Sequence, residues 1–260
     1  MPWAPRKLSD VGIYHVGSRG AGLQIIFEDD RDRRRFVELI ARYLDVLSES
    51  CTEGEQAPEV LAWCLMSNHF HLVVKAAPGV LSQFMMRLLR AYSYYFNERH
   101  GRVGQLYQGH FWSEPILGEG QLLTVVRYVH QNPWKVGLAD SCEWPWSSYG
   151  EYLGTPAFTS TELVLGILGG EDPRGEFARF CSQADFEADV RDGNERQAPL
   201  SDGDALDIAH DILGEVVFRE ISSLPKGERD AALAQLKEAG LSIRQIGRLT
   251  GIGRGIISRA

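Results

Sequence analysis

The chain of 260 residues contains no long apolar segment. A membrane-spanning helix takes roughly 18 or more consecutive apolar residues, and no stretch of this sequence approaches that length. The first ten residues, MPWAPRKLSD, also lack the apolar centre of a secretory signal peptide. We therefore expect a cytoplasmic protein without a membrane partner, long enough for one sizeable core and an additional region.

Cysteine is scarce, and its spacing shows no pairing. The four cysteines, Cys51, Cys64, Cys142 and Cys181, include no C-x-x-C pair. Such pairs are typical of zinc sites, and disulfide frameworks are typical of small secreted chains. The sequence therefore predicts reduced thiols, with neither a zinc site nor a disulfide.

Positive charge is in short supply over the whole chain, whose net charge is −8. Because Lys and Arg make the contacts to phosphate, this charge argues at first against a nucleic-acid partner. However, residues 151–236 carry 18 acidic and 7 basic side chains, whereas residues 237–260 carry 1 acidic and 5 basic ones. The net charge therefore says little about any one surface of the protein.

Strand and helix signals alternate along the first part of the chain. Strands are expected at 12–20 and 60–76, a turn and a further strand at 103–117, and amphipathic helices at 30–50, 81–101 and 120–132, the last ending at Pro133. This order predicts a mixed α/β domain with helices laid against a sheet. We place that domain at residues 1–152, an acidic helical extension and linker at 153–200, and a third region at 201–260.

The basic end of the sequence, residues 236–260, has the spacing of a helix-turn-helix. The second helix of such a motif enters the major groove of DNA, although any basic helical hairpin has a similar pattern. The positions expected to pack together are Ile243, Ile246, Leu249, Ile252, Ile256 and Ile257. The arginines expected to face DNA are Arg244, Arg248, Arg254 and Arg259.

Two histidines lie one residue apart in the segment WCLMSNHFHLVVKA, residues 63–76. In a strand, His69 and His71 share one face, while Phe70, Leu72 and Val74 form an apolar row on the other. A lone buried histidine is most often a hydrogen-bonded core residue. Two on one face raise the odds of a shared metal ion, because imidazole is a common metal ligand. A third ligand would have to come from elsewhere in the chain.

Several segments occur together in an order that resembles the single-tyrosine HUH transposases, in particular the subgroup associated with repetitive extragenic palindromes (REP elements). These segments are YHVGSRG, DRDRRRF, WCLMSNHFHLVV, YSYYFNERHGRVGQLYQGHFWS, LLTVVRYVHQNPWKVGL and WPWSSY, which lie within residues 8–150. The resemblance implies an α+β fold, with a ferredoxin-like HUH domain built on an antiparallel sheet. It also implies an all-α C-terminal extension that ends in a helix-turn-helix.

The same resemblance implies the catalytic residues. The family's nucleophile corresponds to Tyr128 in RYVHQNP, and its third metal ligand corresponds to Asn132. Residues i and i+4 of a helix lie on one face, so Tyr128 and Asn132 would point to the same place. The amide oxygen of Asn132 suits Mg²⁺ or Mn²⁺, which His69 and His71 would also bind. The implied reaction is cleavage and rejoining of single-stranded or hairpin DNA through a 5′-phosphotyrosine intermediate, by a monomer or homodimer.

Basic and aromatic side chains near these motifs are candidates for the DNA groove, where aromatic rings can stack on bases. They are Arg19, Arg87, Arg90, Arg99, Arg102, Lys135, Tyr107, Phe111 and Trp112. Other tyrosines are expected to have structural roles: Tyr92, Tyr94 and Tyr95 packing on a helix, and Tyr14 supporting the sheet.

Two other kinds of protein would share parts of this pattern. A DNA-binding regulator derived from a transposase would keep the fold but would have no reason to keep His69, His71, Tyr128 and Asn132 together. A metal-dependent nuclease that uses water would need the histidines but not Tyr128. Covalent attachment of product DNA to the protein distinguishes the transposase from both.

Overall fold

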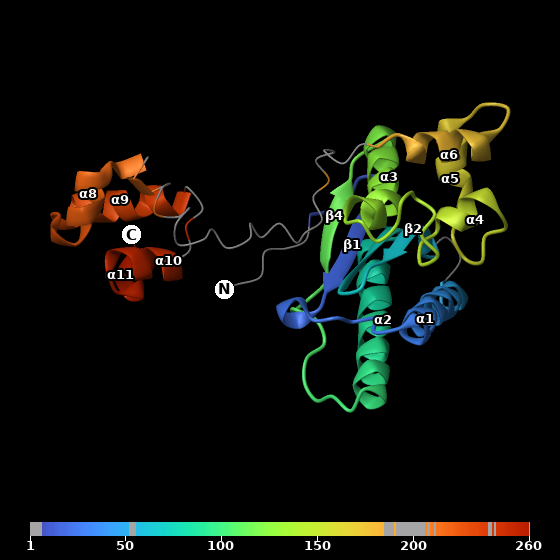
Figure 1. The fold of residues 1–260 in the computed structure, drawn as a ribbon, viewed down its shortest axis with the longest axis horizontal. Helices are drawn as coiled ribbons and strands as arrows, with labels where there is room; N and C mark the ends of the chain where they lie inside the picture. The colour runs from blue at the N-terminus through green and yellow to red at the C-terminus, as the bar shows by residue number, and fades with distance from the viewer. Residues whose placement is uncertain are drawn as a thin grey trace. The chain divides into compact units, whose positions relative to one another are not determined.

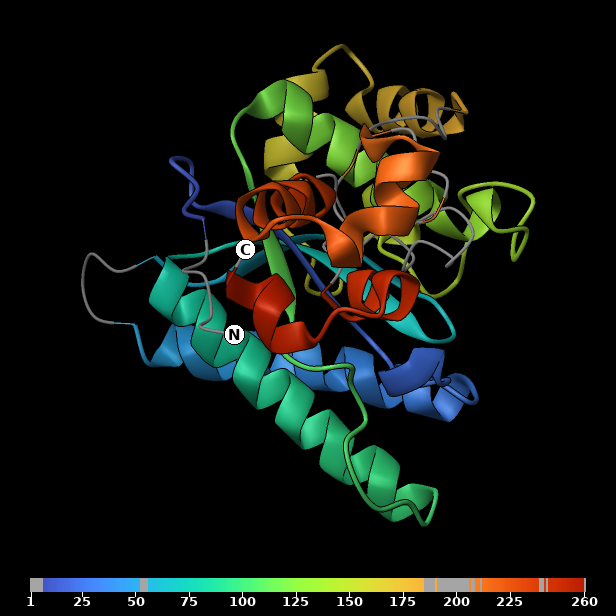
Figure 2. The ribbon, with the colours of Figure 1, turned by 90° about the vertical axis from the view of Figure 1, so that its left-hand side faces the viewer.

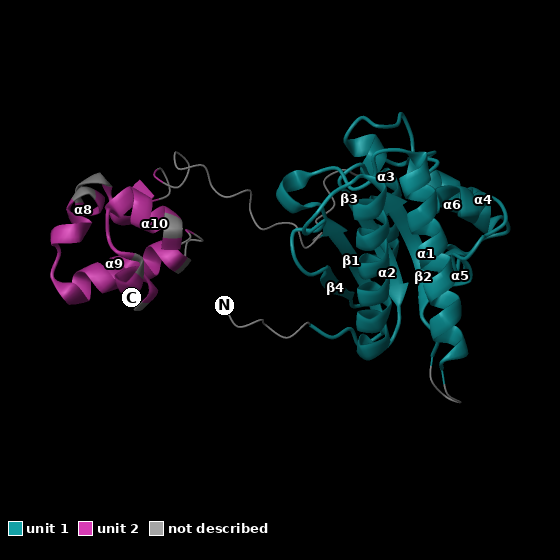
Figure 3. Cartoon of the chain, turned by 90° about the horizontal axis from the view of Figure 1, so that it is seen from below, with its two compact units in different colours: residues 1–194 teal, residues 195–260 magenta. Residues whose placement is uncertain are grey.

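The chain folds into two compact units, residues 1–194 and residues 195–260 (Figure 3). The computed structural model describes residues 7–51, 56–184, 190, 206, 209–210, 212–238, 241 and 243–259. The sequence suggested a boundary after residue 152, but the helices that follow it belong to the first unit. The second expected boundary, after residue 200, lies outside the described residues.

A four-stranded antiparallel sheet forms the centre of the first unit. Its strands are β1 (Ile13–Arg19), β2 (Glu59–Leu65), β3 (His69–Lys75) and β4 (Trp112–Ile116), in the order β2-β3-β1-β4. The single strand expected over 60–76 is in fact two strands of a hairpin. The residues between them include Ser67 and Asn68, which favour a turn, and the N–H of Met66 donates to the carbonyl of His69 over 2.9 Å.

Helices cover both faces of this sheet (Figure 1). On one face lie α1 (Asp30–Glu49) and α2 (Pro78–Arg99), side by side in Figures 1 and 2. On the other lie α3 (Glu119–Lys135), α4 (Tyr149–Leu153), α5 (Glu162–Leu168) and α6 (Pro173–Ser182). A short 3-10 helix, η1 (Ala21–Leu23), follows β1. The order β1-α1-β2-β3-α2-β4 is the ferredoxin-like arrangement, so the predicted α+β fold with a ferredoxin-like domain is confirmed.

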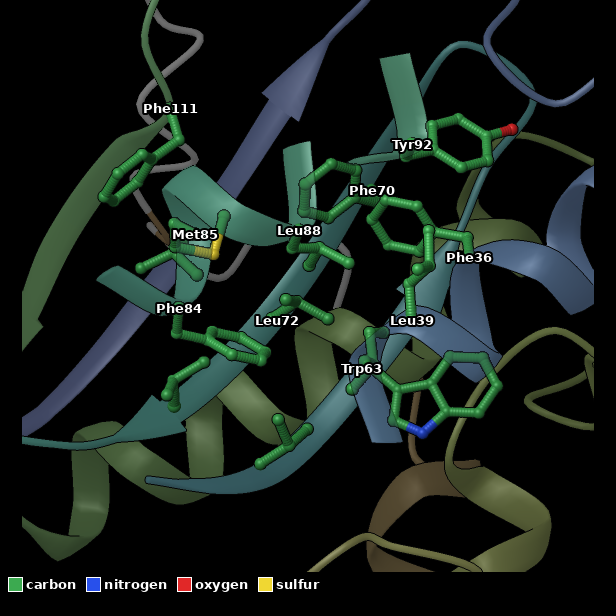
Figure 4. Close-up of a cluster of buried hydrophobic side chains, with 14 of the residues drawn as sticks. Phe36, Leu39, Trp63, Phe70, Leu72, Phe84, Met85, Leu88, Tyr92 and Phe111 are labelled. Atoms are coloured by element: carbon green, nitrogen blue, oxygen red, sulfur yellow. The ribbon is translucent and has the colours of Figure 1, made fainter. Parts of the chain in front are cut away.

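The larger hydrophobic core fills the space between the sheet and helices α1 and α2 (Figure 4). Phe70, Leu72 and Val74 of β3 all point into it, as their alternation in the sequence predicts. From the helices, Phe36 packs on Phe70 with ring centroids 4.7 Å apart, and Tyr92 donates its hydroxyl to the carbonyl of Ile26. The expected packing role of Tyr92 is confirmed, whereas Tyr94 is 71% exposed and does not pack.

Polar contacts join the start of α1 to the end of α2. Asp29 caps α1 by accepting hydrogen bonds from the N–H groups of Arg31 and Asp32. Arg99, at the end of α2, forms ion pairs with Asp29 and with the fully buried Asp32. His100 also contacts the Asp32 carboxylate, at 3.0 Å. This cluster fixes the two ends of the helices together.

The opposite face of the sheet carries a second core that includes α3 and the helices after residue 148. The rings of Tyr152 in α4 and Phe177 in α6 stack with centroids 4.0 Å apart, and the Tyr152 hydroxyl donates to the carbonyl of Leu61 in β2. These contacts explain why α4, α5 and α6 are part of the sheet domain rather than of a separate extension.

Helix α3 runs two residues past Pro133, so the prediction that it stops there is wrong. A proline removes one N–H from the helix, and inside a helix it forfeits one backbone hydrogen bond. Pro133 lies in the last turn and is buried. The helix then ends near Gly137, whose φ of 72° is in the left-handed region.

The second unit is helical over its described residues. It contains α8 (Glu215–Glu220), the 3-10 helix η2 (Ile221–Ser223), α9 (Lys226–Glu238), α10 (Ile243–Thr250) and α11 (Arg254–Arg259). Ile246, Ile252 and Ile257 are buried in its core, with Ile243 and Leu249 packed against them. Ile256 was expected to pack but is 36% exposed. Residues 251–253 join α10 to α11, with Gly251 at a φ of 71°.

Two further features of the structure concern its cysteines and the apolar length of its helices. All four cysteines are free thiols, as predicted. Within the described part of the chain, no helix is long and apolar enough to cross a membrane.

Candidate functional site

Four elements meet around His71, on the face of the sheet that α3 covers. His69 and His71 project from β3 with ring centroids 5.0 Å apart, opposite in direction to Phe70. His71 is fully buried and His69 is partly buried. From α3, the ring of Tyr128 lies 5.6 Å from the ring of His71. The structure therefore brings together the histidine pair and the tyrosine that the sequence selected.

Asn132 reaches the same place from one turn further along α3. Its Nδ2 atom lies 3.3 Å from Nε2 of His71. The oxygen and nitrogen of an asparagine amide are assigned from their hydrogen-bonding partners. A flip of this amide by 180° exchanges Nδ2 and Oδ1. The Asn132 oxygen would then lie beside Nε2 of His71, and both atoms could donate lone pairs to one metal ion.

The contacts of the two histidines indicate which ring nitrogen carries the lone pair. Nδ1 of His69 lies 2.7 Å from the side-chain oxygen of Asn68, an acceptor, so the proton is on Nδ1 and the lone pair on Nε2. Burial lowers the pKa of His71 well below its ordinary value of 6.5, and the neighbouring His69, His15 and Arg19 lower this pKa further. His71 is therefore neutral at pH 7, as a metal-binding imidazole must be.

His15 was not selected from the sequence, yet it is part of this site. It lies in β1 and is buried, with Nε2 3.1 Å from Nδ1 of His71 and its ring 5.9 Å from that of Tyr128. The alternation of IYHVGSR could have revealed it. His15, Gly17 and Arg19 share one face of β1, while Tyr14 and Val16 point into the core, where Tyr14 supports the sheet as expected.

Trp112 of β4 completes the inner wall of the site. Its ring lies 4.6 Å from the ring of His15 and 5.8 Å from that of His71. A Cβ atom on Gly17 would lie 2.5 Å from the Trp112 ring, so this ring needs glycine at position 17. Trp112 was expected near DNA, and the structure places it beside the histidines.

Two of the predicted basic residues lie at the site. Arg19 of β1 lies directly opposite His69 in the register of the neighbouring strand β3. The ammonium group of Lys135 lies 5.8 Å from the centre of the Tyr128 ring. These two positive charges suit a site that receives a phosphodiester.

The other predicted DNA contacts of the first unit do not join this site. Arg87 and Arg90 are exposed on α2, which packs on the opposite face of the sheet. Arg99 is held by Asp29 and Asp32, and Arg102 contacts Gln24. Tyr107 and Phe111 are buried in the core, 5% and 8% exposed, so the expectation that their rings stack on bases is wrong.

In the second unit, Arg248 is exposed on α10. The side chains of Arg244, Arg254 and Arg259 lie outside the described part of the structure.

The residues present fit a divalent cation with two imidazole ligands and one amide ligand. Among the described residues, no group of three or more His, Cys, Asp or Glu side chains could hold a metal ion. The set His69, His71 and Asn132 has only two members of these types, so a metal ion bound here would take the amide as its third ligand. The Asn132 amide beside Nε2 of the buried, neutral His71 supports that fit.

Part of the sequence is similar to a known protein family. Residues 23–132 match the family model described as "Transposase IS200 like". This range contains His69, His71, Tyr128 and Asn132. This part of the chain is therefore similar to IS200-like transposases.

One solved structure is similar to this chain over 62% of its length. Its title is "Structure of the REP associates tyrosine transposase bound to a REP hairpin", and 96% of that chain is covered, with 14% sequence identity and a TM-score of 0.41. None of the curated proteins compared matches this chain.

Proposed function

We propose that this protein is a metal-dependent single-strand DNA endonuclease and strand transferase that uses Tyr128 as its nucleophile. The observation that carries the proposal is the position of α3, which brings Tyr128 and Asn132 to the buried His71. The match of residues 23–132 to IS200-like transposases supports the same reaction class.

In the proposed reaction, the phenolate oxygen of Tyr128 attacks the phosphorus of a DNA phosphodiester. A bond forms between this oxygen and phosphorus, and the bond from phosphorus to the 3′ oxygen breaks. The leaving 3′ oxygen takes up a proton, which gives a 5′-phosphotyrosine and a free 3′-hydroxyl. Because the phosphodiester energy is kept in the new bond, the reverse attack by a 3′-hydroxyl rejoins a strand without ATP.

The residues around Tyr128 would favour its attack. A phenol is almost entirely protonated at pH 7, since its pKa in water is about 10. The positive charge of Lys135, 5.8 Å from the ring, would stabilise the phenolate. His69, His71 and Asn132 would hold Mg²⁺ or Mn²⁺, which when bound would neutralise charge on the phosphate oxygens. Arg19 would hold a neighbouring phosphate.

We propose single-stranded DNA that folds back into a hairpin as the substrate, on the basis of the sequence motifs shared with the REP-associated transposases. The aromatic ring of Trp112, which lies beside His15, would stack on an unpaired base of this DNA.

The test is a search for a covalent protein–DNA adduct. A labelled hairpin from the DNA that flanks the gene is incubated with the protein and Mn²⁺, then separated under denaturing conditions. We expect an adduct with the wild-type protein and with Tyr94→Phe, a matched change at an exposed tyrosine of α2. Tyr128→Phe should give no adduct but should bind the hairpin nearly as well, because only the attacking hydroxyl is lost.

Other outcomes would assign a different function. Cleavage without an adduct in the wild-type protein would indicate a nuclease that uses water. Hairpin binding without cleavage would indicate a DNA-binding regulator. Adducts that persist in Tyr128→Phe would place the nucleophile at another tyrosine.

A further inference from the structure

A cavity of about 230 Å³ lies between β4 and the first half of α3, next to the proposed catalytic site. Glu114, Pro115 and Ile116 of β4 form one side, and Gln121, Thr124 and Val125 of α3 form the other. His15 also lines this cavity, and its Nε2 is 3.1 Å from His71. The cavity and the catalytic site therefore share a wall.

The described lining of this cavity suits a neutral group rather than a phosphate. It includes the carboxylate of Glu114 and no Lys or Arg. A carboxylate repels phosphate oxygens but accepts hydrogen bonds from N–H groups. The volume is also smaller than the roughly 300–1,000 Å³ of pockets for drug-sized ligands, so it fits a single heterocyclic base.

Hydrogen bonds within the lining indicate which polar atoms face a ligand. Oε1 of Gln121 accepts from the N–H of Leu117 at 2.8 Å, so the amide group with N–H donors is Nε2. The hydroxyl of Thr124 donates to the carbonyl of Gly120, which leaves its oxygen as an acceptor. The cavity thus combines the acceptors of Glu114 and Thr124 with the donor of Gln121.

Guanine is the DNA base whose edge matches this combination. Its Watson–Crick edge has two adjacent donors, N1–H and N2–H, beside one acceptor, O6. The two oxygens of Glu114 can accept from both donors, while Gln121 donates to O6. Adenine, cytosine and thymine have no pair of adjacent N–H donors on that edge.

We propose that this cavity binds one unpaired guanine of the substrate strand, close to the phosphodiester that Tyr128 attacks, with Glu114 as the specificity-determining residue. The proposal rests on the proposed function, because the guanine belongs to the DNA that the site would cleave. It gives the enzyme a way to select the cleavage position that the catalytic residues themselves do not provide, since those contact only the backbone.

The test compares guanine with inosine, which lacks only the N2 amino group. Hairpins with a single-stranded oligothymidine flank are made with one guanine or one inosine at each flank position in turn. Binding is measured by fluorescence anisotropy without a metal ion, so that no strand is cut. At one position we expect guanine to bind about fivefold or more tightly than inosine, the smallest effect of a good bidentate contact.

Two variants identify the residue responsible. Glu114→Gln keeps the shape of the side chain but has only one acceptor, so it should bind both oligonucleotides equally. Glu119→Gln removes the same charge from an exposed residue nearby that does not line the cavity, and it should keep the preference. No guanine preference in the wild-type protein, or the same preference in Glu114→Gln, would overturn the proposal.

The same oligonucleotides with Mn²⁺ separate this proposal from the proposed function. Covalent adducts without any guanine preference would overturn the guanine site alone. A guanine preference lost in Glu114→Gln, without adducts at any position, would support the guanine site while removing the proposed strand cleavage.

Discussion

His71 is the residue on which the other groups of the site converge. One ring nitrogen faces Asn132 and the other faces His15, and the ring itself has no exposed surface. A side chain held on both sides keeps one orientation, which a metal ligand requires. We therefore expect different effects from substitutions of Asn132, of His15 and of His71 itself.

The first prediction compares the three proposed ligands. His69→Ala and His71→Ala should reduce cleavage to background at any Mn²⁺ concentration, because each leaves one imidazole. Asn132→Ala keeps both imidazoles, so excess Mn²⁺ should restore cleavage, with the half-maximal concentration raised at least about tenfold. The measurement is a titration of cleavage with Mn²⁺. Full activity of His71→Ala at limiting Mn²⁺ would contradict the metal assignment.

The second prediction concerns His15, which contacts His71 and also lines the proposed guanine cavity. His15→Phe keeps an aromatic ring against Trp112 and removes the nitrogen beside Nδ1 of His71. We expect the Mn²⁺ concentration for half-maximal cleavage to rise about 10- to 100-fold, as for other partners of metal ligands. The exposed His110 provides the control His110→Ala, which should not change it. A lower melting temperature with an unchanged Mn²⁺ titration would show that His15 only supports the fold.

At the scale of elements, α3 is the part that makes a site out of the sheet. Its buried His130 lies 2.7 Å, through Nε2, from the hydroxyl of Ser148, which in turn accepts from the backbone N–H of Trp63 in β2. This contact fixes the rotation of α3 about its axis. Tyr128 and Asn132 then face β1 and β3 rather than solvent.

The third prediction concerns the joined ends of α1 and α2. Arg99 holds the pKa of Asp29 well below its ordinary value of 3.8. A carboxyl group whose pKa is lower in the folded state than in the unfolded state stabilises the fold. This contribution is complete at pH values above the unfolded-state pKa, and it is lost as the pH falls through the folded-state pKa. Asp29→Asn keeps the helix cap but removes the charge. This substitution should therefore lower the free energy of unfolding at pH 7. The difference from the wild-type protein should become smaller as the pH falls below 3.8.

Urea unfolding of both proteins at a series of pH values measures this difference. Asp30→Asn removes an exposed charge of the same helix turn and serves as the control. A difference between wild type and Asp29→Asn that stays the same from neutral to acidic pH would show that the ion pair with Arg99 does not stabilise the fold.

At the scale of the whole molecule, the two units differ in charge as well as in architecture. The sheet domain carries the proposed chemistry, while the arginines of 237–260 lie in α10 and α11 of the second unit. Leu241, Ile246, Ile252 and Ile257 from this segment are buried in the core of that unit. Deleting the segment would remove part of this core, so a change of charge is the better probe of DNA binding.

The fourth prediction concerns a variant in which four arginines are replaced with Gln: Arg244, Arg248, Arg254 and Arg259. We expect this variant to bind DNA more weakly and its affinity to depend less on the salt concentration. If two to four of them neutralise phosphates, the slope of log affinity against log salt should fall by about 0.9 per contact on duplex DNA and about 0.7 on single strands. Cleavage at saturating DNA should stay nearly unchanged. The exposed Arg174 and Arg179 of α6, replaced together with Gln, should leave the slope as it is. An unchanged slope in the fourfold variant would remove the proposed DNA contact.

The sequence alone was enough to predict the long helices α1, α2 and α3 and the faces of β1 and β3. A period of two placed His69 and His71 opposite Phe70, Leu72 and Val74, and a spacing of four placed Tyr128 and Asn132 on one side of a helix. These relations are local, because the geometry of a single strand or helix fixes them. The family resemblance of the motifs supplied the roles of the same residues.

Which of these residues contact residues far away in the sequence depends on the three-dimensional packing of the elements. It placed His15 of β1 against His71 and formed a cavity between Glu114 and α3, whereas Arg87 and Arg90 lie on a helix of the opposite face. It also placed Tyr107 and Phe111 in the core. These contacts depend on strand order, on register and on the packing of α3, which join residues far apart along the chain. No local pattern in the sequence contains that information.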